Sequence, residues 1–191
     1  NGDAVMAICG LDLIRRRALP KKTLVATVMS NMGLDQCIAK AGGRVVRTRV
    51  GDRYVVEELR RSGYSFGGEQ SGHLVFLDHA TTGDGTVAAL ALLSVMVESG
   101  KPVSELARCM EVFPQAQLGL VVKSKPELGS LPGVMRAIRD AEKKLGANGR
   151  VLVRYSGTEP KVRVLVEGPE QKSIDSYAAQ ILAELKKAIG A

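Results

Sequence analysis

The first 111 residues alternate between segments with helical spacing of apolar residues and short runs typical of strands. Because strands separated by helices need right-handed crossover connections, this alternation predicts a mainly parallel α/β sandwich with helices on both sheet faces. The expected helices cover residues 5–14, 31–41, 55–59, 85–99 and 103–109, and the expected strands cover residues 23–28, 45–48, 65–67 and 74–77.

Residues 85–99 are apolar on every side, which predicts a buried helix that ends at Gly100. Asp84 is expected to cap this helix, because residues 82–85 resemble a metal loop but contain one carboxylate only. Asn31 is the expected cap of the helix that follows it. Asp52 is likewise placed to cap the helix that begins there, which is an alternative to any chemical role.

The pattern changes near residues 112–115, where Pro114 follows the short helix. A strand at 117–122, a helix at 134–145, strands at 150–153 and 161–166 and a helix at 174–189 predict a small α+β domain. Both of its helices are expected on one face of the sheet. The sequence thus predicts two domains, residues 1–113 and residues 114–191.

The loop between the last two strands reads Arg-Tyr-Ser-Gly-Thr-Glu-Pro, residues 154–160, and a further arginine, Arg163, lies on the next strand. Guanidinium groups offer forked, charge-assisted hydrogen bonds, and hydroxyls with loop amides can complete a phosphate-binding site. The alternative is a hairpin turn in which Ser-Gly-Thr serves geometry alone.

The loop at residues 67–73 reads Gly-Gly-Glu-Gln-Ser-Gly-His. Its glycines allow a close approach of the backbone to a ligand, and its carboxylate, amide, hydroxyl and imidazole can surround the hydroxyls of a sugar ring. A polar connection in a hairpin is the alternative.

These two loops, in this order, resemble those of the alpha-D-phosphohexomutase superfamily. The resemblance implies that the chain is a fragment with the third and fourth of the superfamily's four domains, the fourth being TBP-like. The first domain of such enzymes carries a phosphorylated serine in a Thr-Ala-Ser-His-Asn-Pro-like segment, and the second carries an Asp-Gly-Asp-Gly-Asp magnesium loop. Neither segment occurs in this sequence.

The resemblance also implies roles for single residues. Glu69 and Ser71 are expected to bind the sugar hydroxyls, with Arg53 and His73 as further substrate contacts. Asp52 and His73 are candidates for assistance in proton transfer, although some relatives carry His where this chain has Asp52, and a structural role for His73 stays open. The residues expected to hold the phosphate that is not transferred are Arg154, Ser156, Gly157, Thr158 and Arg163.

Gln70 and the complete 154–160 string favour, within the superfamily, an isomerase that interconverts glucosamine 6-phosphate and glucosamine 1-phosphate for amino-sugar and cell-wall precursor synthesis. The resemblance implies a phosphoserine enzyme, a hexosamine bisphosphate intermediate, and Mg²⁺ bound by the second domain. This fragment is then expected to bind substrate without turnover. A phosphoglucose or phosphomannose mutase and a non-catalytic phosphosugar-binding module are the alternatives.

Charge and cysteine content bear on partners and compartment. The net charge of +7 is expected to attract anionic phosphosugars. The low aromatic content of 4% and the scattered positions of the cations disfavour nucleic-acid binding. The longest apolar run, residues 87–97, is too short for a membrane span. Three cysteines without Cys-x-x-Cys spacing indicate reduced thiols in the cytoplasm. The expected partners are a phosphosugar and the protein's own N-terminal domains, and a homodimer of the full-length protein stays open.

Overall fold

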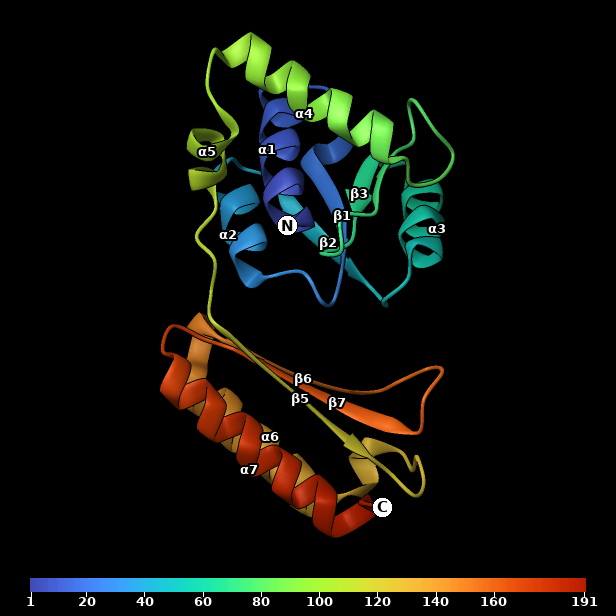
Figure 1. The fold of residues 1–191 in the computed structure, drawn as a ribbon, viewed down its shortest axis with the longest axis vertical. Helices are drawn as coiled ribbons and strands as arrows, with labels where there is room; N and C mark the ends of the chain where they lie inside the picture. Colours follow the sequence, from blue (N-terminus) through green and yellow to red (C-terminus); the bar gives the residue numbers. More distant parts are fainter. The chain divides into compact units, whose positions relative to one another are not determined.

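The computed structural model describes residues 1–191 and contains two compact units, Asn1–Val112 and Phe113–Ala191 (Figure 1). Each unit has a sheet of its own and a hydrophobic core of its own. The two units are therefore described separately.

The sheet of the first unit is mainly parallel, as the sequence predicted. Its strands run in the order β2-β1-β3-β4, with β1 parallel to both β2 and β3, and β4 antiparallel to β3. The strands are β1 (Thr23–Thr27), β2 (Arg44–Thr48), β3 (Phe66–Gly68) and β4 (Leu74–Phe76). The helices are α1 (Gly2–Arg15), α2 (Met32–Lys40), α3 (Asp52–Ser62), α4 (Gly85–Ser99) and α5 (Val103–Leu106), and the single-turn helices are η1 (Pro20–Lys22) and η2 (Ala107–Cys109).

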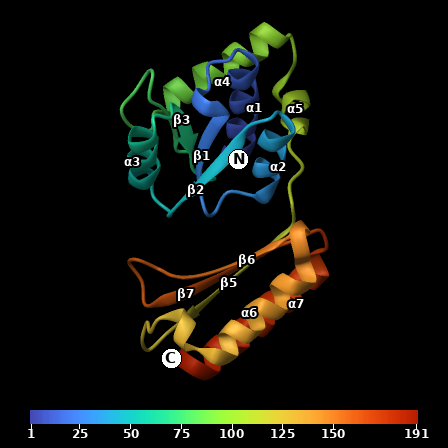
Figure 2. The same ribbon diagram turned by 180° about the vertical axis from the view of Figure 1, so that it is seen from behind.

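Alternating side chains of β1 separate two cores, which makes the unit a three-layer sandwich. Leu24 and Ala26 belong to a core shared with α1, α2 and α4, whereas Val25 belongs to a core shared with α3. Figures 1 and 2 show α1 and α3 at different faces of this sheet. The predicted placement of helices on both sheet faces is confirmed.

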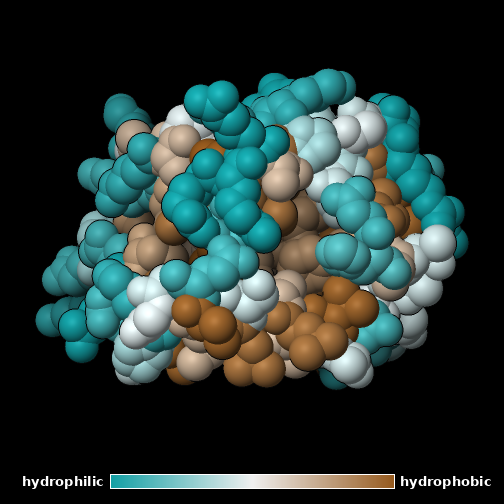
Figure 3. Space-filling model, turned by 90° about the horizontal axis from the view of Figure 1, so that it is seen from above, coloured by the Kyte–Doolittle hydropathy of each residue, from teal (hydrophilic) through white to brown (hydrophobic).

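Helix α4 is less buried than its sequence predicted. Leu90, Leu93 and Val97 are 61%, 51% and 81% exposed, and only Ala88 and Val95 of this helix are buried. Apolar residues gather on the face of the molecule seen in Figure 3. The prediction of a buried helix was wrong because a helix that is apolar on every side does not specify which face its own domain covers.

Two of the three predicted helix caps are confirmed. The Asn31 side chain accepts a hydrogen bond from the Gly33 amide at 3.0 Å, and Asp84 Oδ1 accepts from the amides of Thr86 and Val87 at 2.7 and 3.0 Å. For α3 the prediction was wrong, because Gly51 occupies the cap position and Asp52 is the first helical residue. The Asp52 carboxylate is thereby placed beyond the cap, where it can face another loop.

The second unit is a three-stranded antiparallel sheet with the order β5-β7-β6 and two helices against one face (Figure 2). Val162, Val164 and Val166 of the central strand join the core formed with α6 and α7, while alternate residues face away from the helices. The elements are β5 (Gln115–Val121), η3 (Leu128–Ser130), α6 (Pro132–Leu145), η4 (Gly146–Asn148), β6 (Arg150–Tyr155), β7 (Lys161–Glu167) and α7 (Gln171–Ile189).

Among all the helices, none is by itself long and apolar enough to cross a membrane. One bent pair, Gly85–Ser99 with Val103–Cys109, reaches the length and hydropathy of a span, with a 92° angle at its break.

Candidate functional site

The loop between β3 and β4 has a fixed backbone conformation. The Glu69 amide donates to the His73 carbonyl and the Gly72 amide donates to the Glu69 carbonyl, both at 3.0 Å. The Gln70 carbonyl accepts a hydrogen bond of 3.0 Å from Gly2, in the first turn of α1. The side chains of Glu69 and Ser71 are thus presented from a backbone that is held at both its ends and its middle.

A second loop, between β2 and α3, meets the first one. The Gly51 amide donates to Glu69 Oε1 at 2.9 Å, and Asp52 Oδ2 lies 3.5 Å from Nε2 of His73. Both loops follow strands that run parallel to β1, so they lie at the carboxyl ends of the parallel strands. Ligands of open α/β sheets bind at such an edge.

His73 is held by more than its contact with Asp52. A Cβ atom added at Gly83 would lie 1.9 Å from Cδ2 of the His73 ring, so the imidazole packs directly on the backbone of Gly83. Only glycine permits this approach. The ring nevertheless stays 43% exposed, which leaves it accessible to a ligand.

Arg53 lies beside an aromatic ring. Its guanidinium stands over Tyr54 with 5.1 Å to the ring centroid, and Arg49 stands 5.9 Å from the same ring. Cations at such distances are attracted by the face of an aromatic ring. Arg49 therefore adds a second positive charge beside Tyr54, and the sequence did not predict a role for it.

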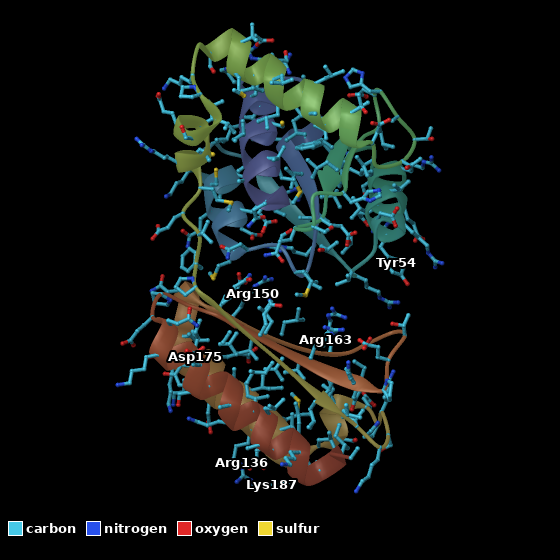
Figure 4. The ribbon with its side chains drawn as sticks, viewed as in Figure 1. Tyr54, Arg136, Arg150, Arg163, Asp175 and Lys187 are labelled. Atoms are coloured by element: carbon cyan, nitrogen blue, oxygen red, sulfur yellow. The ribbon has the colours of Figure 1, made fainter.

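The phosphate-loop candidate joins β6 to β7. Arg154 of β6 and Arg163 of β7 are directly opposite each other in the strand register. On its other side Arg163 is opposite Gly119 of β5. Like charges that face each other across strands repel. Burial, and then the charge of Arg163, lower the pKa of the Arg154 guanidinium. Figure 4 shows Arg163 on the side of the sheet away from the helices, and Arg154, its partner in the strand register, shares that face.

The turn after Arg154 is built around Ser156. Ser156 is buried, its amide donates to the Lys161 carbonyl at 2.8 Å, and its Oγ accepts from the Glu159 amide at 3.3 Å. Gly157 and Thr158 are exposed. The Ser156 hydroxyl thus supports the turn, while the next two residues face solvent.

Two charged residues complete this loop, and the sequence reasoning assigned neither. Lys125 Nζ donates to the Ser156 carbonyl at 2.7 Å, and Glu159 forms ion pairs with Lys161 at 2.7 Å and Arg163 at 2.6 Å. Lys161, then Arg163, lower the pKa of the Glu159 carboxyl. A single lysine before Pro126 gives no sequence signal, whereas Glu159 lies inside the string already identified and could have been found.

The residues of this chain do not fit a magnesium site. No group of three or more His, Cys, Asp or Glu side chains is arranged to hold a metal ion. Asp84, in the segment that resembles a metal loop, instead caps α4.

Comparison with protein families covers most of the chain. Residues 1–113 match the model described as phosphoglucomutase/phosphomannomutase, alpha/beta/alpha domain III. Residues 120–184 match the phosphoglucomutase/phosphomannomutase C-terminal domain.

The chain is also similar to bacterial proteins named phosphoglucosamine mutase. It is 66% identical over 190 residues to that of Anaeromyxobacter dehalogenans, covering 100% of this chain and 42% of the relative. It is 59% identical over 189 residues to that of Myxococcus xanthus, covering 99% and 41%. The chain therefore spans about two fifths of the length of the relatives that it matches.

Solved structures share the fold. N-acetylphosphoglucosamine mutase of Aspergillus fumigatus matches with a TM-score of 0.81 and 20% identity, over 98% of this chain and 43% of that one. A phosphoglucomutase/phosphomannomutase family protein of Burkholderia thailandensis matches with a TM-score of 0.71 and 22% identity, over 97% and 41%. The Aspergillus enzyme has also been solved with GlcNAc-6P and magnesium, in a structure that matches this chain with a TM-score of 0.78.

Proposed function

The chain belongs to the phosphoglucomutase/phosphomannomutase family, and from this premise we propose that it is the substrate-positioning part of a phosphoglucosamine mutase. The whole protein would interconvert glucosamine 6-phosphate and glucosamine 1-phosphate. The observation that carries the proposal is the 66% identity with a phosphoglucosamine mutase along the entire chain.

Glu69 and Ser71 would bind the sugar. One oxygen of Glu69 accepts from the Gly51 amide, and this bond aims the carboxylate while its second oxygen accepts from a sugar hydroxyl. Ser71 is exposed in the same fixed loop and adds a hydroxyl contact. Arg53 and Arg49, both beside Tyr54, would attract the anionic end of the substrate to this loop.

The hairpin of β6 and β7 would hold the phosphate that is not being transferred. Arg154 and Arg163 face each other with like charge, so a dianion bound beside them relieves their repulsion. The exposed amides of Gly157 and Thr158 and the Thr158 hydroxyl add donors, and Ser156 keeps the turn in shape. In this scheme the phosphate replaces Glu159 as the ion-pair partner of Arg163.

Asp52 and His73 would assist proton transfer. A hydroxyl that accepts or releases a phosphoryl group must lose or regain a proton, and a positioned acid–base pair lowers that barrier. The two side chains are 3.5 Å apart and partly exposed, which suits a relay that opens to substrate.

The remaining machinery would lie outside this chain. A phosphoserine would give its phosphoryl group to one end of the sugar and take one back from the other end of the bisphosphate. Mg²⁺ would be bound in the same outer region, where it would neutralise the charge of the transferred group. This chain would contribute to that chemistry only through the proton transfer proposed for Asp52 and His73.

We further propose the domain limits 1–113 and 114–191, a cytoplasmic location in keeping with three free cysteines, and association with the protein's own N-terminal domains. Neither nucleic acid nor membrane is proposed as a partner. Measuring the mass of the full-length protein in solution would show whether it forms a homodimer.

The test uses the longer protein that contains this chain, assayed with Mg²⁺ and a hexose bisphosphate. Glucosamine 6-phosphate is expected to be converted with a higher kcat/KM than glucose 6-phosphate or mannose 6-phosphate. Preference for either neutral sugar would replace the proposal by another member of the family. If the protein binds all three sugar phosphates but converts none of them, it would be a phosphosugar-binding module.

A further inference from the structure

The first turn of α1 contacts two loops at the carboxyl edge of the sheet in the first unit. The Gly2 amide donates a hydrogen bond of 3.0 Å to the Gln70 carbonyl, in the loop between β3 and β4. Oδ2 of Asp3 accepts a hydrogen bond of 2.9 Å from the Asn31 amide, in the loop between β1 and α2. Because β1 and β3 are parallel neighbours, the first turn of α1 joins loops that leave adjacent strands.

Gly2 packs against the backbone of the sugar loop, residues 69–73, without space for a side chain. A Cβ atom at this position would lie 2.3 Å from the carbonyl oxygen of Glu69 and 2.7 Å from the amide nitrogen of Gly72. It would also lie 2.9 Å from the carbonyl oxygen of Gln70. All three are backbone atoms, so no rotation of a side chain can make room. Gly2 does not have a positive φ, so the close approach alone calls for glycine here.

The atoms that meet Gly2 also hold the shape of the sugar loop. The Gly72 amide donates to the Glu69 carbonyl at 3.0 Å, which closes the turn that presents Ser71. Oε1 of Glu69 accepts from the Gly51 amide at 2.9 Å, so the carboxylate has a fixed position as well. A methyl group between α1 and this turn would therefore displace both proposed sugar ligands, Glu69 and Ser71.

Asp3 attaches the same turn of α1 to the loop after β1. The residue is fully buried, and its own amide donates a hydrogen bond of 2.9 Å to the Asn1 side chain. The dipole of the helix favours a carboxylate in the first turn. The bond from the Asn31 amide to Oδ2 thus joins two groups that are both held in place.

The loop that Asp3 contacts, residues 28–31, is also held by Arg47 of β2. Nη1 of this arginine donates to the carbonyls of Thr27 and Ser30 at 2.8 and 2.7 Å. The loop after β1 is therefore fixed at its backbone. The first turn of α1 connects this fixed loop to the sugar loop.

We propose that the first turn of α1 positions the sugar loop for its substrate, with Gly2 and Asp3 as positioning residues. Gly2 sets how closely the loop approaches α1, and Asp3 holds the turn to the loop after β1. The inference rests on the proposed function, because it takes Glu69 and Ser71 as ligands of the sugar hydroxyls. Gly2 and Asp3 act through that loop and not by contact with the sugar.

The first experiment measures amide hydrogen exchange by NMR in the 191-residue chain and needs no turnover. Gly2→Ala is expected to speed exchange of the Gly72 amide by at least about tenfold, while exchange in β1 stays unchanged. Gly10→Ala is the matched control in the same helix, because a Cβ atom there would first meet the ends of the Ile38 and Leu24 side chains, at 3.0 and 3.1 Å. Unchanged exchange at Gly72, or equally faster exchange in β1, would overturn the proposal.

The second experiment measures the conversion of glucosamine 6-phosphate by the longer protein. Gly2→Ala is expected to lower kcat/KM by about 10²-fold, mainly through a higher KM, because a misplacement on the order of 1 Å has an effect of this size. A merely structural role would reduce the amount of folded enzyme, and with it kcat, but would leave KM unchanged.

A pair of variants at Asp3 tests the other contact and serves also if Gly2→Ala does not fold. Asp3→Ala is expected to raise KM and to speed exchange in the sugar loop. Asp3→Asn is expected to restore both, because its amide oxygen can accept from Asn31 and the carboxylate oxygen Oδ1 accepts no hydrogen bond that would be lost.

The outcomes separate this inference from the proposed function. If the wild type converts glucosamine 6-phosphate and the variants Gly2→Ala and Asp3→Ala keep its KM, the inference is wrong and the function stands. If the wild type converts no sugar phosphate, the proposed function fails and the role in sugar binding fails with it. The exchange rates then still decide whether the first turn of α1 holds the loop.

Discussion

Nε2 of His73 lies 3.5 Å from Oδ2 of Asp52, and the two side chains come from different loops of the first unit. Asp52 is the first residue of α3, and Gly51 takes the cap position. The other carboxylate oxygen of Asp52, Oδ1, accepts a hydrogen bond of 2.7 Å from the Arg53 amide. The contact with His73 joins the two groups that we propose for proton transfer.

Asp52→Asn and His73→Gln in the longer protein are expected each to lower kcat by about 10²-fold, because a positioned acid–base group contributes at least that factor. If the pair acts as a unit, the double variant loses little more than either single one. His79→Gln is the matched control, since His79 is the chain's other histidine and is exposed. If the fold-losses in kcat of the two single variants instead multiply in the double variant, the two residues act separately.

Arg154→Ala in the longer protein is expected to raise KM strongly, with a loss of ~2–4 kcal/mol in kcat/KM, as for a desolvated charge pair with phosphate. Arg136→Ala serves as the control, because Arg136 is exposed on α6, on the helical side of the unit, away from Arg163 (Figure 4). Equal kinetics for both variants would reduce residues 154–160 to a structural turn.

Glu159 should titrate below the usual carboxyl value of 4.5, because Lys161 and then Arg163 stabilise its charged form. A depressed folded-state pKa gives stability that is present above the unfolded pKa and is lost as pH falls through the folded one. An NMR titration is expected to show a midpoint below 4.5 that rises in Lys161→Ala, since the largest cause is then removed. An unchanged midpoint would contradict the ion pair with Lys161.

Phe66→Ala is expected to destabilise the first unit by about 3–5 kcal/mol, the range for removing a buried aromatic ring. Phe66 is fully buried and stacks on Phe76 with 4.3 Å between ring centroids. Val97→Ala, at a side chain that is 81% exposed, should change stability by less than about 0.5 kcal/mol. Chemical denaturation measures both. Similar losses would mean that the exposed face of α4 is a structural part of the isolated chain.

The purified 191-residue chain is expected to show no mutase turnover, because it spans only 42% of the relative to which it is 66% identical. The assay follows glucosamine 6-phosphate with Mg²⁺ and a bisphosphate. Turnover above a blank that contains the Arg154→Ala chain would contradict the assignment of the chemistry to another region.

Much of the fold could be predicted because short-range patterns encode it. The alternation of Leu24, Val25 and Ala26 between two cores follows from the strand period, and the caps Asn31 and Asp84 follow from their side chains. The exposure of Leu90 could not be predicted, because an all-round apolar helix carries no information on which side lacks a partner.

Contacts between loops that are distant in the sequence could not be predicted either. The Gly51 amide donates to Glu69 and the Lys125 ammonium donates to the Ser156 carbonyl, and both contacts join residues far apart in the chain. The run that contains Gly51 resembles a loop of the superfamily, but that resemblance does not show which residue its amide contacts, and Lys125 stands in no distinctive pattern. A motif identified the carboxylate and the turn, but the groups that orient them depend on tertiary packing.

The position of Arg154 opposite Arg163 would link folding of the second unit to the binding of the proposed phosphate. In the unfolded chain the two guanidiniums are no longer held opposite each other, so the paired arrangement exists only in the folded hairpin. An anion that binds the folded hairpin alone shifts the unfolding equilibrium by RT ln(1 + [L]/Kd), or about 2.7 kcal/mol at a hundredfold excess over Kd. Inorganic phosphate, compared with chloride at equal ionic strength, should therefore raise the melting temperature of this unit even where no sugar is present and no reaction can occur.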